Sequence, residues 1–420
     1  MSRSGTLIVS YTFPPSPGIG GRRWAKFAKY LHRAGEDIMV LKARARKQER
    51  SVWEKDVKEF EDRIIELPSG YPRILDRSPR SIAEKLHYRI ALTALKLRTK
   101  RNYYDRSAFW QNPLLKELEK WIQKGYKNLI IAAPPYHCSH DVLRLKEKHP
   151  DLNIILDLRD FWTQNENIYG FTTLSEARLA REKKLEKESI EGADRVFVVN
   201  QVFVEYFSSL LSSDEEKEKV RLLTNGYDVE DLVHHPEETA PNDRMRGVFI
   251  GTFPRNSVLL LRELAEVLKE LKEEAPEIYR AFELDIYGSV PAGIEDILDS
   301  ELPVHFRGKI PIAEVQKELS KSHFGALFQT DGGKFNFITK FYEYLAKKLP
   351  ILVFSNPGRT GDFVRDNGLG YACFSGDMKA PLKKAFEDWK KDAFAIRTDL
   401  DIEAFDVQCL AKDKIIPHLK

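Results

Sequence analysis

Three groups of residues in this sequence have types and spacings that suit a phosphorylated ligand. The first is a glycine-rich loop, 18–23, in which Gly20 and Gly21 precede Arg22 and Arg23. Glycine lets backbone amides approach an anion, and a helix that starts after such a loop adds free N–H groups and a positive dipole end. We expect an anion site to which the arginines add positive charge; an ordinary glycine-rich turn is the alternative.

The second group consists of charged residues that follow predicted strands. Asp157, Arg159 and Asp160 come at the end of one apolar run, and His137 follows another. Ligands in open α/β sheets bind beyond the carboxyl ends of the strands, so these side chains are placed to meet a ligand. We expect Arg159 to bind substrate and Asp160 and His137 to serve the reaction. A structural ion pair and a satisfied structural histidine are the alternatives.

The third group lies at the start of a predicted helix, 341–348. Thr339 is predicted as its N-cap, and Lys340 and Glu343 share a face because they are three residues apart. A phosphate there would meet amides, a hydroxyl and an ammonium, and Glu343 would accept both hydroxyls of a ribose. An exposed Lys–Glu pair of little energetic consequence is the alternative.

Two smaller signals accompany these groups. Arg255 comes just past a predicted strand that ends near Gly251, where it can meet a diphosphate or be merely solvated. Asn225 belongs to an Asn-Gly turn, which is common and weak by itself. No group of His, Cys and Asp has the spacing of a metal site, so we expect no metal and no other cofactor.

The elements that must position these residues are two successive sets of alternating strands and helices. Strand, helix and strand with short connections form βαβ units, which imply parallel sheets. The predicted strands are 6–10, 37–41, 129–133, 153–157, 195–199 and 220–223, followed by 247–251, 282–288, 324–328 and 351–354. A polar segment with two prolines, 236–243, has the composition of a linker.

The expected architecture is therefore two Rossmann-like α/β domains facing each other across a cleft. The first is predicted over 1–235, joined by a C-terminal helix at 403–420, and the second over 244–402. A chain of 420 residues, 42% hydrophobic and 31% charged, is long enough for two cores.

Cysteine content and charge bear on where the protein works. Three cysteines without short spacing fit a reducing, cytoplasmic compartment. No segment approaches the roughly 20 apolar residues of a membrane span. The stretch 71–106 carries ten Lys or Arg against three acids. Mixed with apolar residues, it suits peripheral contact with an anionic membrane or a solvated basic helix. No recognition motif for nucleic acid accompanies the charge.

Taken in order, these pieces resemble the retaining GT-B glycosyltransferases (family 4-like) that build surface polysaccharides and lipopolysaccharide. The resemblance spans nearly the whole chain. It rests on the Pro-Pro and Gly-Gly loop, Asp105…Trp110, Ala133-Pro134-Pro135, Asp157-x-Arg159-Asp160-x-Trp162, Asn225-Gly226-x-Asp228 and Lys340-x-x-Glu343-Tyr344-Leu345-Ala346.

The resemblance implies a nucleotide-diphosphate sugar as donor, bound mainly by the second domain, and a glycan or lipid-linked acceptor bound by the first. It places the ribose at Glu343 and the diphosphate at Thr339, Lys340 and Arg255, with Gly20 and Gly21 near the phosphates and Gly288 near the base. The sequence departs from the family at Asn336, where many members carry a glutamate beside the transferred sugar.

Three rival functions remain open. The first is a nucleotide-sugar epimerase of the same fold, which needs acid and base carboxylates and no second substrate. The second is a non-catalytic nucleotide-sugar-binding protein, which the departure at Asn336 favours. An NAD enzyme is the third, and it fits poorly because Arg23 replaces the third glycine of the dinucleotide fingerprint.

Overall fold

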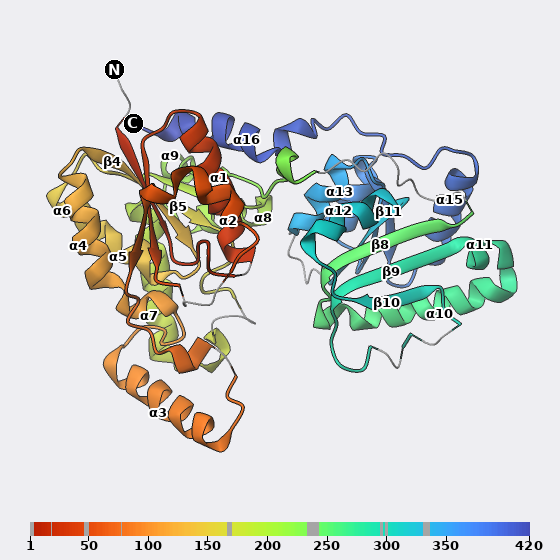
Figure 1. The fold of residues 1–420 in the computed structure, drawn as a ribbon, viewed down its shortest axis with the longest axis horizontal. Coiled ribbons are helices and arrows are strands. Elements are labelled where there is room, and N and C mark those ends of the chain that lie inside the picture. Colours follow the sequence, from red (N-terminus) through yellow and green to blue (C-terminus); the bar gives the residue numbers. More distant parts are fainter. Residues whose placement is uncertain are drawn as a thin grey trace. The chain divides into compact units, whose positions relative to one another are not determined.

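The structure is a computed structural model that describes residues 4–17, 19–45, 50–76, 78–165, 170–232, 243–294, 297–298, 301–330 and 337–420. The chain divides into two compact units (Figure 1). The first unit comprises Met1–Thr224 and Gln408–Lys420, and the second comprises Asn225–Val407. Among the described residues, no helix combines the length and apolar character that crossing a membrane requires.

The first unit is built on a seven-stranded sheet in which all neighbouring strands are parallel. The strand order is β3-β2-β1-β4-β5-β6-β7. The strands are β1 (Gly5–Ser10), β2 (Ile38–Ala43), β3 (Ile64–Leu67), β4 (Tyr126–Ala133), β5 (Asn153–Leu158), β6 (Arg195–Val198) and β7 (Val220–Leu222).

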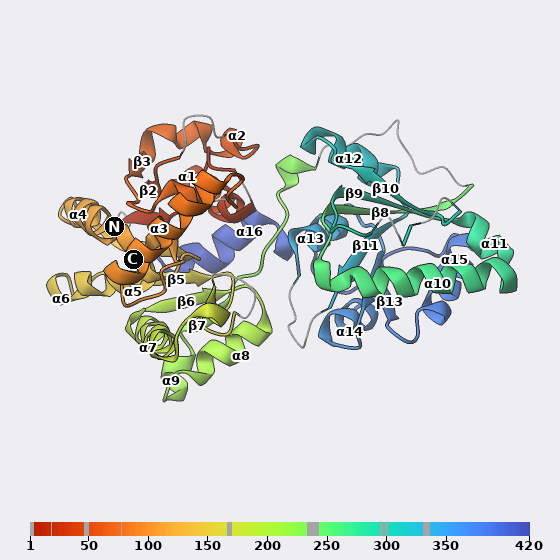
Figure 2. The same ribbon diagram turned by 90° about the horizontal axis from the view of Figure 1, so that it is seen from below.

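Helices connect and cover these strands (Figure 2). They are α1 (Arg22–Arg33), α2 (Glu54–Val57), α3 (Ile82–Arg98), α4 (Gln111–Ile122), α5 (His137–Asp141), α6 (Leu145–Lys148), α7 (Glu176–Gly192), α8 (Gln201–Ser209) and α9 (Asp214–Lys217). On α1, the apolar residues Trp24, Phe27 and Leu31 recur at helical spacing, and all three are completely or almost completely buried. Gly35 follows that helix with φ at +84°, a conformation that glycine adopts without strain.

The second unit is built on a six-stranded parallel sheet of order β10-β9-β8-β11-β12-β13. Its strands are β8 (Met245–Thr252), β9 (Phe282–Ser289), β10 (Val304–Gly308), β11 (Phe324–Gln329), β12 (Ile351–Ser355) and β13 (Gly370–Phe374). Its helices are α10 (Val258–Glu274), α11 (Pro276–Ala281), α12 (Ile312–Ser320), α13 (Thr339–Ala346), α14 (Arg359–Asp366) and α15 (Lys379–Lys390).

Alternating residues of the second sheet pack against different helices. On β8, Phe249 packs in a cluster with α10 and α15, whereas Val248 and Ile250 pack in another with α12, α13 and α14. Successive side chains of a strand point to opposite faces, so the two clusters lie on the two faces of the sheet. Burial of both faces explains why the strands are nearly continuous apolar runs.

The two parallel α/β sheets confirm the predicted fold class. Residues 407–420, expected as part of one helix, form short turns: α16 (Val407–Leu410) and three-to-five-residue helical segments after it. The end of the chain joins the first unit, where the amide of Ser4 donates to the carbonyl of Lys420 at 2.9 Å. The expected linker, 236–243, lies outside the described residues except for Asp243.

Candidate functional site

The glycine-rich loop of the first unit leads directly into α1. Gly20 and Gly21 lie in the short helical turn η1 (Ile19–Gly21), while Gly18 lies outside the described residues. Gly21 takes the N-cap position, so no side chain caps the first amides of α1. A Cβ on Gly21 would come within 3.3 Å of the Thr12 carbonyl oxygen, so the loop packs closely against the end of β1.

The two arginines after this loop do not extend toward a ligand. Arg23 forms a buried double hydrogen bond with Asp157, 2.9 Å from Nε and 2.9 Å from Nη2, and also donates to the carbonyls of Leu223 and Thr224. Arg22 is 4% exposed, with its guanidinium 5.3 Å from the ring centre of Trp53. The expectation that both arginines add charge to an anion site, including Arg22 as a substrate-binding residue, is corrected by this burial.

The charged residues at the end of β5 differ in whether they pair within the fold or remain available to a ligand. Asp157 accepts from Arg23 and from the indole of Trp24, so it is a packing element. Arg159 donates to the Gly20 carbonyl at 2.7 Å, which ties the glycine loop to the end of β5. Its other contacts, at 3.4 Å, are the carbonyls that end β4. Arg159 therefore positions the backbone of the loop.

Asp160 differs from its neighbours in this motif. It is partly buried and makes no hydrogen bond or ion pair with a described residue. Burial raises the pKa of its carboxyl above the ordinary value, and the charge of Arg159 offsets only part of the rise. A strand-end carboxylate with a raised pKa and no structural partner is a candidate for proton transfer.

His137 lies at the centre of a buried ionic cluster. Its Nε2 is 3.0 Å from Glu182, and its Nδ1 is 3.9 Å from Asp105. Glu182 also accepts from the indole of Trp162 and the amide of Asn102. Because the imidazole is 0% exposed, the expectation that His137 serves the reaction is corrected to a structural role.

The charges of this cluster stabilise one another. Burial alone would lower the pKa of His137, but Asp105 and Glu182 outweigh it and raise that pKa. Burial would raise the pKa of Glu182, yet His137 and the donated hydrogen bonds hold it below its ordinary value. The two carboxylates therefore favour the protonated form of the buried imidazole, because a buried charge requires charged or hydrogen-bonding partners.

In the second unit, candidate residues gather where β8 and β9 end. Gly251 and Gly288 lie opposite each other in these strands, with φ of +143° and +132°. A Cβ on Gly288 would lie 1.9 Å from the Gly251 carbonyl oxygen, so only glycine fits. Arg255 follows in η8 (Arg255–Ser257); its side chain is exposed and pairs with no described residue. Asn225, partly exposed, opens this unit.

The helix that carries the third group begins at Thr339, earlier than the predicted start near residue 341. Ile338 takes the N-cap position, so the expectation that Thr339 caps the helix is wrong. Lys340 and Glu343 share a face as predicted and form an ion pair of 2.9 Å. The opposite face of α13 buries Phe341, and Asn336 lies outside the described residues.

These residues occupy one edge of the second sheet. β9, β8 and β11 are neighbours in that order and run parallel, so their carboxyl ends meet at the same edge. Gly251 and Gly288 end two of those strands, Arg255 follows β8, and α13 is the next described helix after β11. A helix start, two glycines and an exposed cation at one edge are what an anionic ligand requires.

A cavity of the first unit was not foreseen. It has a volume of about 390 Å³, and arginines at Arg44, Arg73 and Arg106 line it. Two of these belong to the basic stretch 71–106, and Arg44 directly follows β2. Charged residues at a strand end were the signal that could have revealed it, but the distance in sequence between Arg44 and Arg106 hid their proximity.

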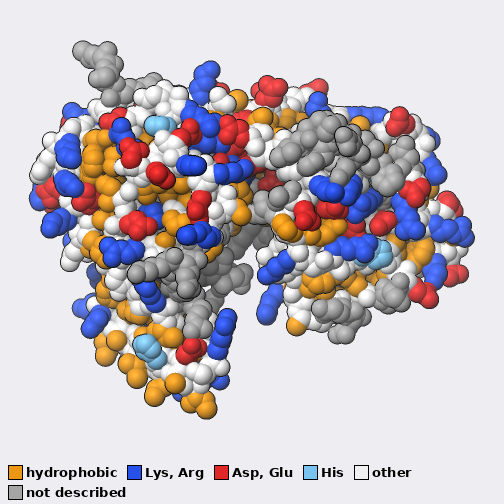
Figure 3. Space-filling model, viewed as in Figure 1, with side chains coloured by type: hydrophobic (Ala, Val, Ile, Leu, Met, Phe, Trp, Pro, Cys, Tyr) orange, Lys and Arg blue, Asp and Glu red, His pale blue; other side chains and the backbone are white. Residues whose placement is uncertain are grey.

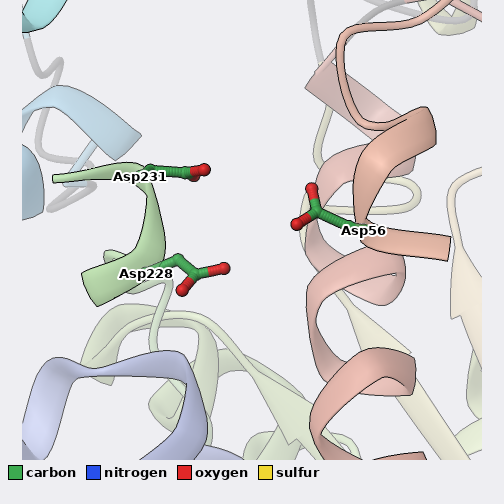
Figure 4. Close-up of side chains that lie close together, drawn as sticks. All are labelled: Asp56, Asp228 and Asp231. Carbon is green, nitrogen blue, oxygen red and sulfur yellow. The ribbon is translucent and has the colours of Figure 1, made fainter. Parts of the chain in front are cut away.

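Figure 4 shows three aspartates whose carboxylates are of the kind that bind metal cations. Asp56 projects from α2 of the first unit, and Asp228 and Asp231 belong to η7 (Val229–Asp231) and its N-cap in the second. Asp56 accepts from Lys26 at 2.8 Å and from Lys29 at 3.2 Å, and Asp228 accepts from the Glu230 amide at 3.0 Å. These contacts give Asp56 and Asp228 structural roles inside their own units.

Comparisons with known proteins identify the fold. No protein-family model and no curated protein matches this chain. Among solved structures it is similar to sucrose-phosphate synthase of Thermosynechococcus elongatus, with a TM-score of 0.63 and 13% identity over 98% of this chain and 97% of that one.

Two further structures are similar over nearly full length. A putative UDP-N-acetylglucosamine 2-epimerase of Listeria monocytogenes has a TM-score of 0.53 and 12% identity, covering 98% and 94% of the two chains. The E. coli trehalose-6-phosphate structure bound with UDP-2-fluoro glucose has a TM-score of 0.52 and 12% identity, covering 99% and 96%. At such low identity the likeness shows the fold, and the chain has the GT-B fold of two parallel α/β domains.

Proposed function

We propose that this protein is a glycosyltransferase that moves a sugar from a nucleotide-diphosphate sugar to a glycan or lipid-linked acceptor in cell-surface polysaccharide synthesis. The observation that carries the proposal is the edge formed by the ends of β9, β8 and β11. It brings two glycines, Arg255 and the start of α13 to one side of the donor domain. Similarity to a structure bound with UDP-2-fluoro glucose supports this assignment.

The proposed mechanism needs no metal. The departing nucleoside diphosphate is stabilised by Arg255, Lys340 and the amides at the start of α13, which act as fixed positive groups. Glu343, 12% exposed and held by Lys340, accepts the ribose hydroxyls. Gly251, where an added Cβ would meet nothing within 4 Å, leaves space for the nucleotide to lie against backbone.

Transfer is proposed to retain the configuration at the sugar's anomeric carbon. The leaving phosphate helps to deprotonate the acceptor on the same face, so no carboxylate nucleophile is needed. The partnerless Asp160 of the first unit is the candidate for assisting that proton transfer. The Gly20 carbonyl accepts from Arg159, and the first amides of α1 after Gly21 are uncapped and can bind an anionic group of a substrate.

The test is product analysis after incubation with a nucleotide sugar, with and without acceptors. Release of nucleoside diphosphate that depends on an acceptor, together with a product of retained anomeric configuration by NMR, supports the proposal. Conversion of donor alone into an epimer supports the alternative function, which similarity to a 2-epimerase favours. Binding of the donor without turnover across acceptors supports a non-catalytic role.

A second proposal concerns the membrane. Helix α3 lies away from the sheet of its unit (Figure 1), and its inner face buries Ala91 and Leu95. Four apolar residues on the outer face are between 60% and 86% exposed: Ile82, Leu86, Ile90 and Leu97. Each residue of an α-helix is rotated by about 100° from the one before, so these four side chains lie within an arc of about 80° around the helix axis.

Basic residues flank this apolar stripe. Lys85, Arg89 and Lys96 project from the sector next to it by the same helical geometry, and all three are exposed. Hydrophobic and basic side chains appear together over this part of the first unit in Figure 3. Such a helix suits the surface of an anionic bilayer, where the stripe enters the interface and the cations meet lipid phosphates. We propose that α3 makes this peripheral contact and so places the enzyme near lipid-linked acceptors.

A further inference from the structure

The cavity of about 390 Å³ in the first unit lies at the ends of three neighbouring strands. Tyr11 and Thr12 follow β1, Arg44 follows β2, and the loop after β3 completes the wall. These strands are adjacent and parallel, so the cavity occupies the carboxyl edge of the sheet. Its volume lies in the range of small-molecule sites, which is about 300–1,000 Å³.

The lining is positively charged. Arg44, Arg73 and Arg106 contribute to it, and no Asp or Glu is among the described residues that line it. Arg44 pairs with no acidic described residue, and all three arginines are exposed. A guanidinium offers a planar fork of donors that matches a phosphate or carboxylate better than a neutral hydroxyl.

The backbone holds these arginines in place. Arg106 opens η4 (Arg106–Phe109), whose N-cap Asp105 is 2% exposed and accepts from the amides of Ser107 at 2.9 Å and Tyr136 at 2.6 Å. The same Asp105 faces His137, so the buried cluster anchors the segment that carries Arg106.

Arg73 and Arg44 are anchored separately. A Cβ on Gly70, where φ is +69°, would lie 3.1 Å from Cβ of Phe109, so the loop before Arg73 packs against η4. The amide of Arg44 donates to the Leu67 carbonyl at 2.9 Å, which fixes it between β2 and β3. The three arginines therefore start from three separately anchored backbone positions around the cavity.

Aromatic side chains complete the lining. Tyr11 packs edge-on against the buried Trp110, with ring centres 5.2 Å apart, and Tyr71 donates from its hydroxyl to the Tyr103 carbonyl at 3.3 Å. Such anchored rings give an apolar surface with a polar tip. The cavity thus offers cations for an anion and rings for the body to which the anion is attached.

We propose that this cavity binds the phosphate group of the acceptor, so that the acceptor is a phosphorylated sugar or a lipid-linked phosphate. Binding of phosphate stands on the cavity alone, whereas the identity of that ligand as acceptor rests on the proposed glycosyltransferase function. Phosphate is favoured over carboxylate because three arginines match the charge and number of its oxygens.

The test measures binding to the full chain without donor, by calorimetry, with four probes: inorganic phosphate, glucose 6-phosphate, glucose and a short prenyl phosphate in neutral detergent. Wild type binds the phosphorylated probes and not glucose. Arg44→Gln, Arg73→Gln and Arg106→Gln each weaken that binding about ten- to hundredfold, as loss of one charge-assisted hydrogen bond predicts. Arg181→Gln, an exposed arginine of α7 outside the cavity, leaves it unchanged.

The outcomes distinguish a soluble from a lipid-linked phosphate ligand, and they test the phosphate site separately from the glycosyltransferase function. Binding of glucose 6-phosphate indicates a soluble sugar phosphate, and binding of the prenyl phosphate alone indicates a lipid-linked one; either supports the site. No binding of any phosphorylated probe, or equal binding by the cavity variants and Arg181→Gln, overturns it. Transfer to a neutral acceptor that the cavity variants do not slow overturns the acceptor assignment and leaves the glycosyltransferase proposal standing. Phosphate binding by the cavity without sugar transfer from any donor supports the phosphate site and overturns the glycosyltransferase proposal.

Discussion

Lys340 and Glu343 lie one turn apart on α13 and form an ion pair of 2.9 Å, with side chains 24% and 12% exposed. The pair is shielded enough to hold the Glu343 carboxylate in one orientation and open enough for a ligand to reach it. A carboxylate fixed in this way can accept two ribose hydroxyls without first losing conformational freedom. This arrangement is the basis of the proposed donor site.

Arg255→Ala is expected to slow transfer without affecting the fold. The side chain is exposed and pairs with no described residue, so the free energy of unfolding should change by less than about 0.5 kcal/mol. If Arg255 stabilises the departing diphosphate, kcat should fall about a hundredfold. Steady-state kinetics and denaturant unfolding check both. The matched control is Arg262→Ala, an exposed arginine of α10, which should alter neither; equal kinetics for the two variants would refute the assignment.

Asp160→Asn is expected to separate stability from activity. The folded-state pKa of Asp160 is raised above its ordinary value of 3.8, so ionisation of this carboxyl costs stability as pH rises through the folded pKa. The neutral amide removes that cost at neutral pH, and the gain should vanish as pH falls toward the unfolded pKa. Unfolding curves across pH test this, and transfer rates should fall in the same variant. Lower stability at neutral pH would mean that the carboxylate has a stabilising partner.

Gly288→Ala is expected to destabilise the second unit by about 2–4 kcal/mol, through backbone strain at positive φ and overlap with the Gly251 carbonyl. Gly251→Ala is the control, because its φ of +143° imposes similar strain while a Cβ there meets nothing within 4 Å. Thermal unfolding should show the smaller loss for the control, about 1–2 kcal/mol. Equal losses would contradict the close approach of these two strands.

The double substitution Leu86→Gln and Ile90→Gln is expected to weaken binding to vesicles of phosphatidylglycerol and phosphatidylcholine at least about tenfold, because two apolar anchors are lost. Both side chains are at least 60% exposed, so folding should be unaffected. Leu259→Gln, at a leucine of α10 in the second unit that is 73% exposed, is the control in a vesicle sedimentation assay. Unchanged binding, or equal binding to vesicles of phosphatidylcholine alone, would argue against the membrane role of α3.

The central strands could be predicted from sequence, and the missed strands share a physical reason. β3, β10 and β13 are each at an edge of a sheet. In β10 only Val304 is fully buried, and β3 buries only Leu67, so neither shows an apolar run. β13 begins at Gly370 and buries only two of its five residues. An edge strand is less enclosed than a central one, so its sequence carries a weaker pattern.

Which charged residues would be available to a ligand could not be predicted. Arg23 and Asp157 looked as suitable as Arg255 and Asp160, but they pair with each other across 134 positions. His137 likewise meets Glu182 from 45 positions away. The sequence places such residues at strand ends, but tertiary pairing decides which of them are consumed by the fold.

The most direct test of the central claim is a thermal-shift screen of nucleotides and nucleotide sugars on wild type, Glu343→Ala and Glu266→Ala. The control residue forms an ion pair at the same three-residue spacing with Lys269 on α10. A ligand at a hundred times its dissociation constant stabilises by about 2.7 kcal/mol. We expect one nucleoside diphosphate or its sugar to stabilise wild type and Glu266→Ala, and this stabilisation to be lost in Glu343→Ala. Stabilisation by NAD only, by no nucleotide, or equally in both variants would contradict the proposed donor site.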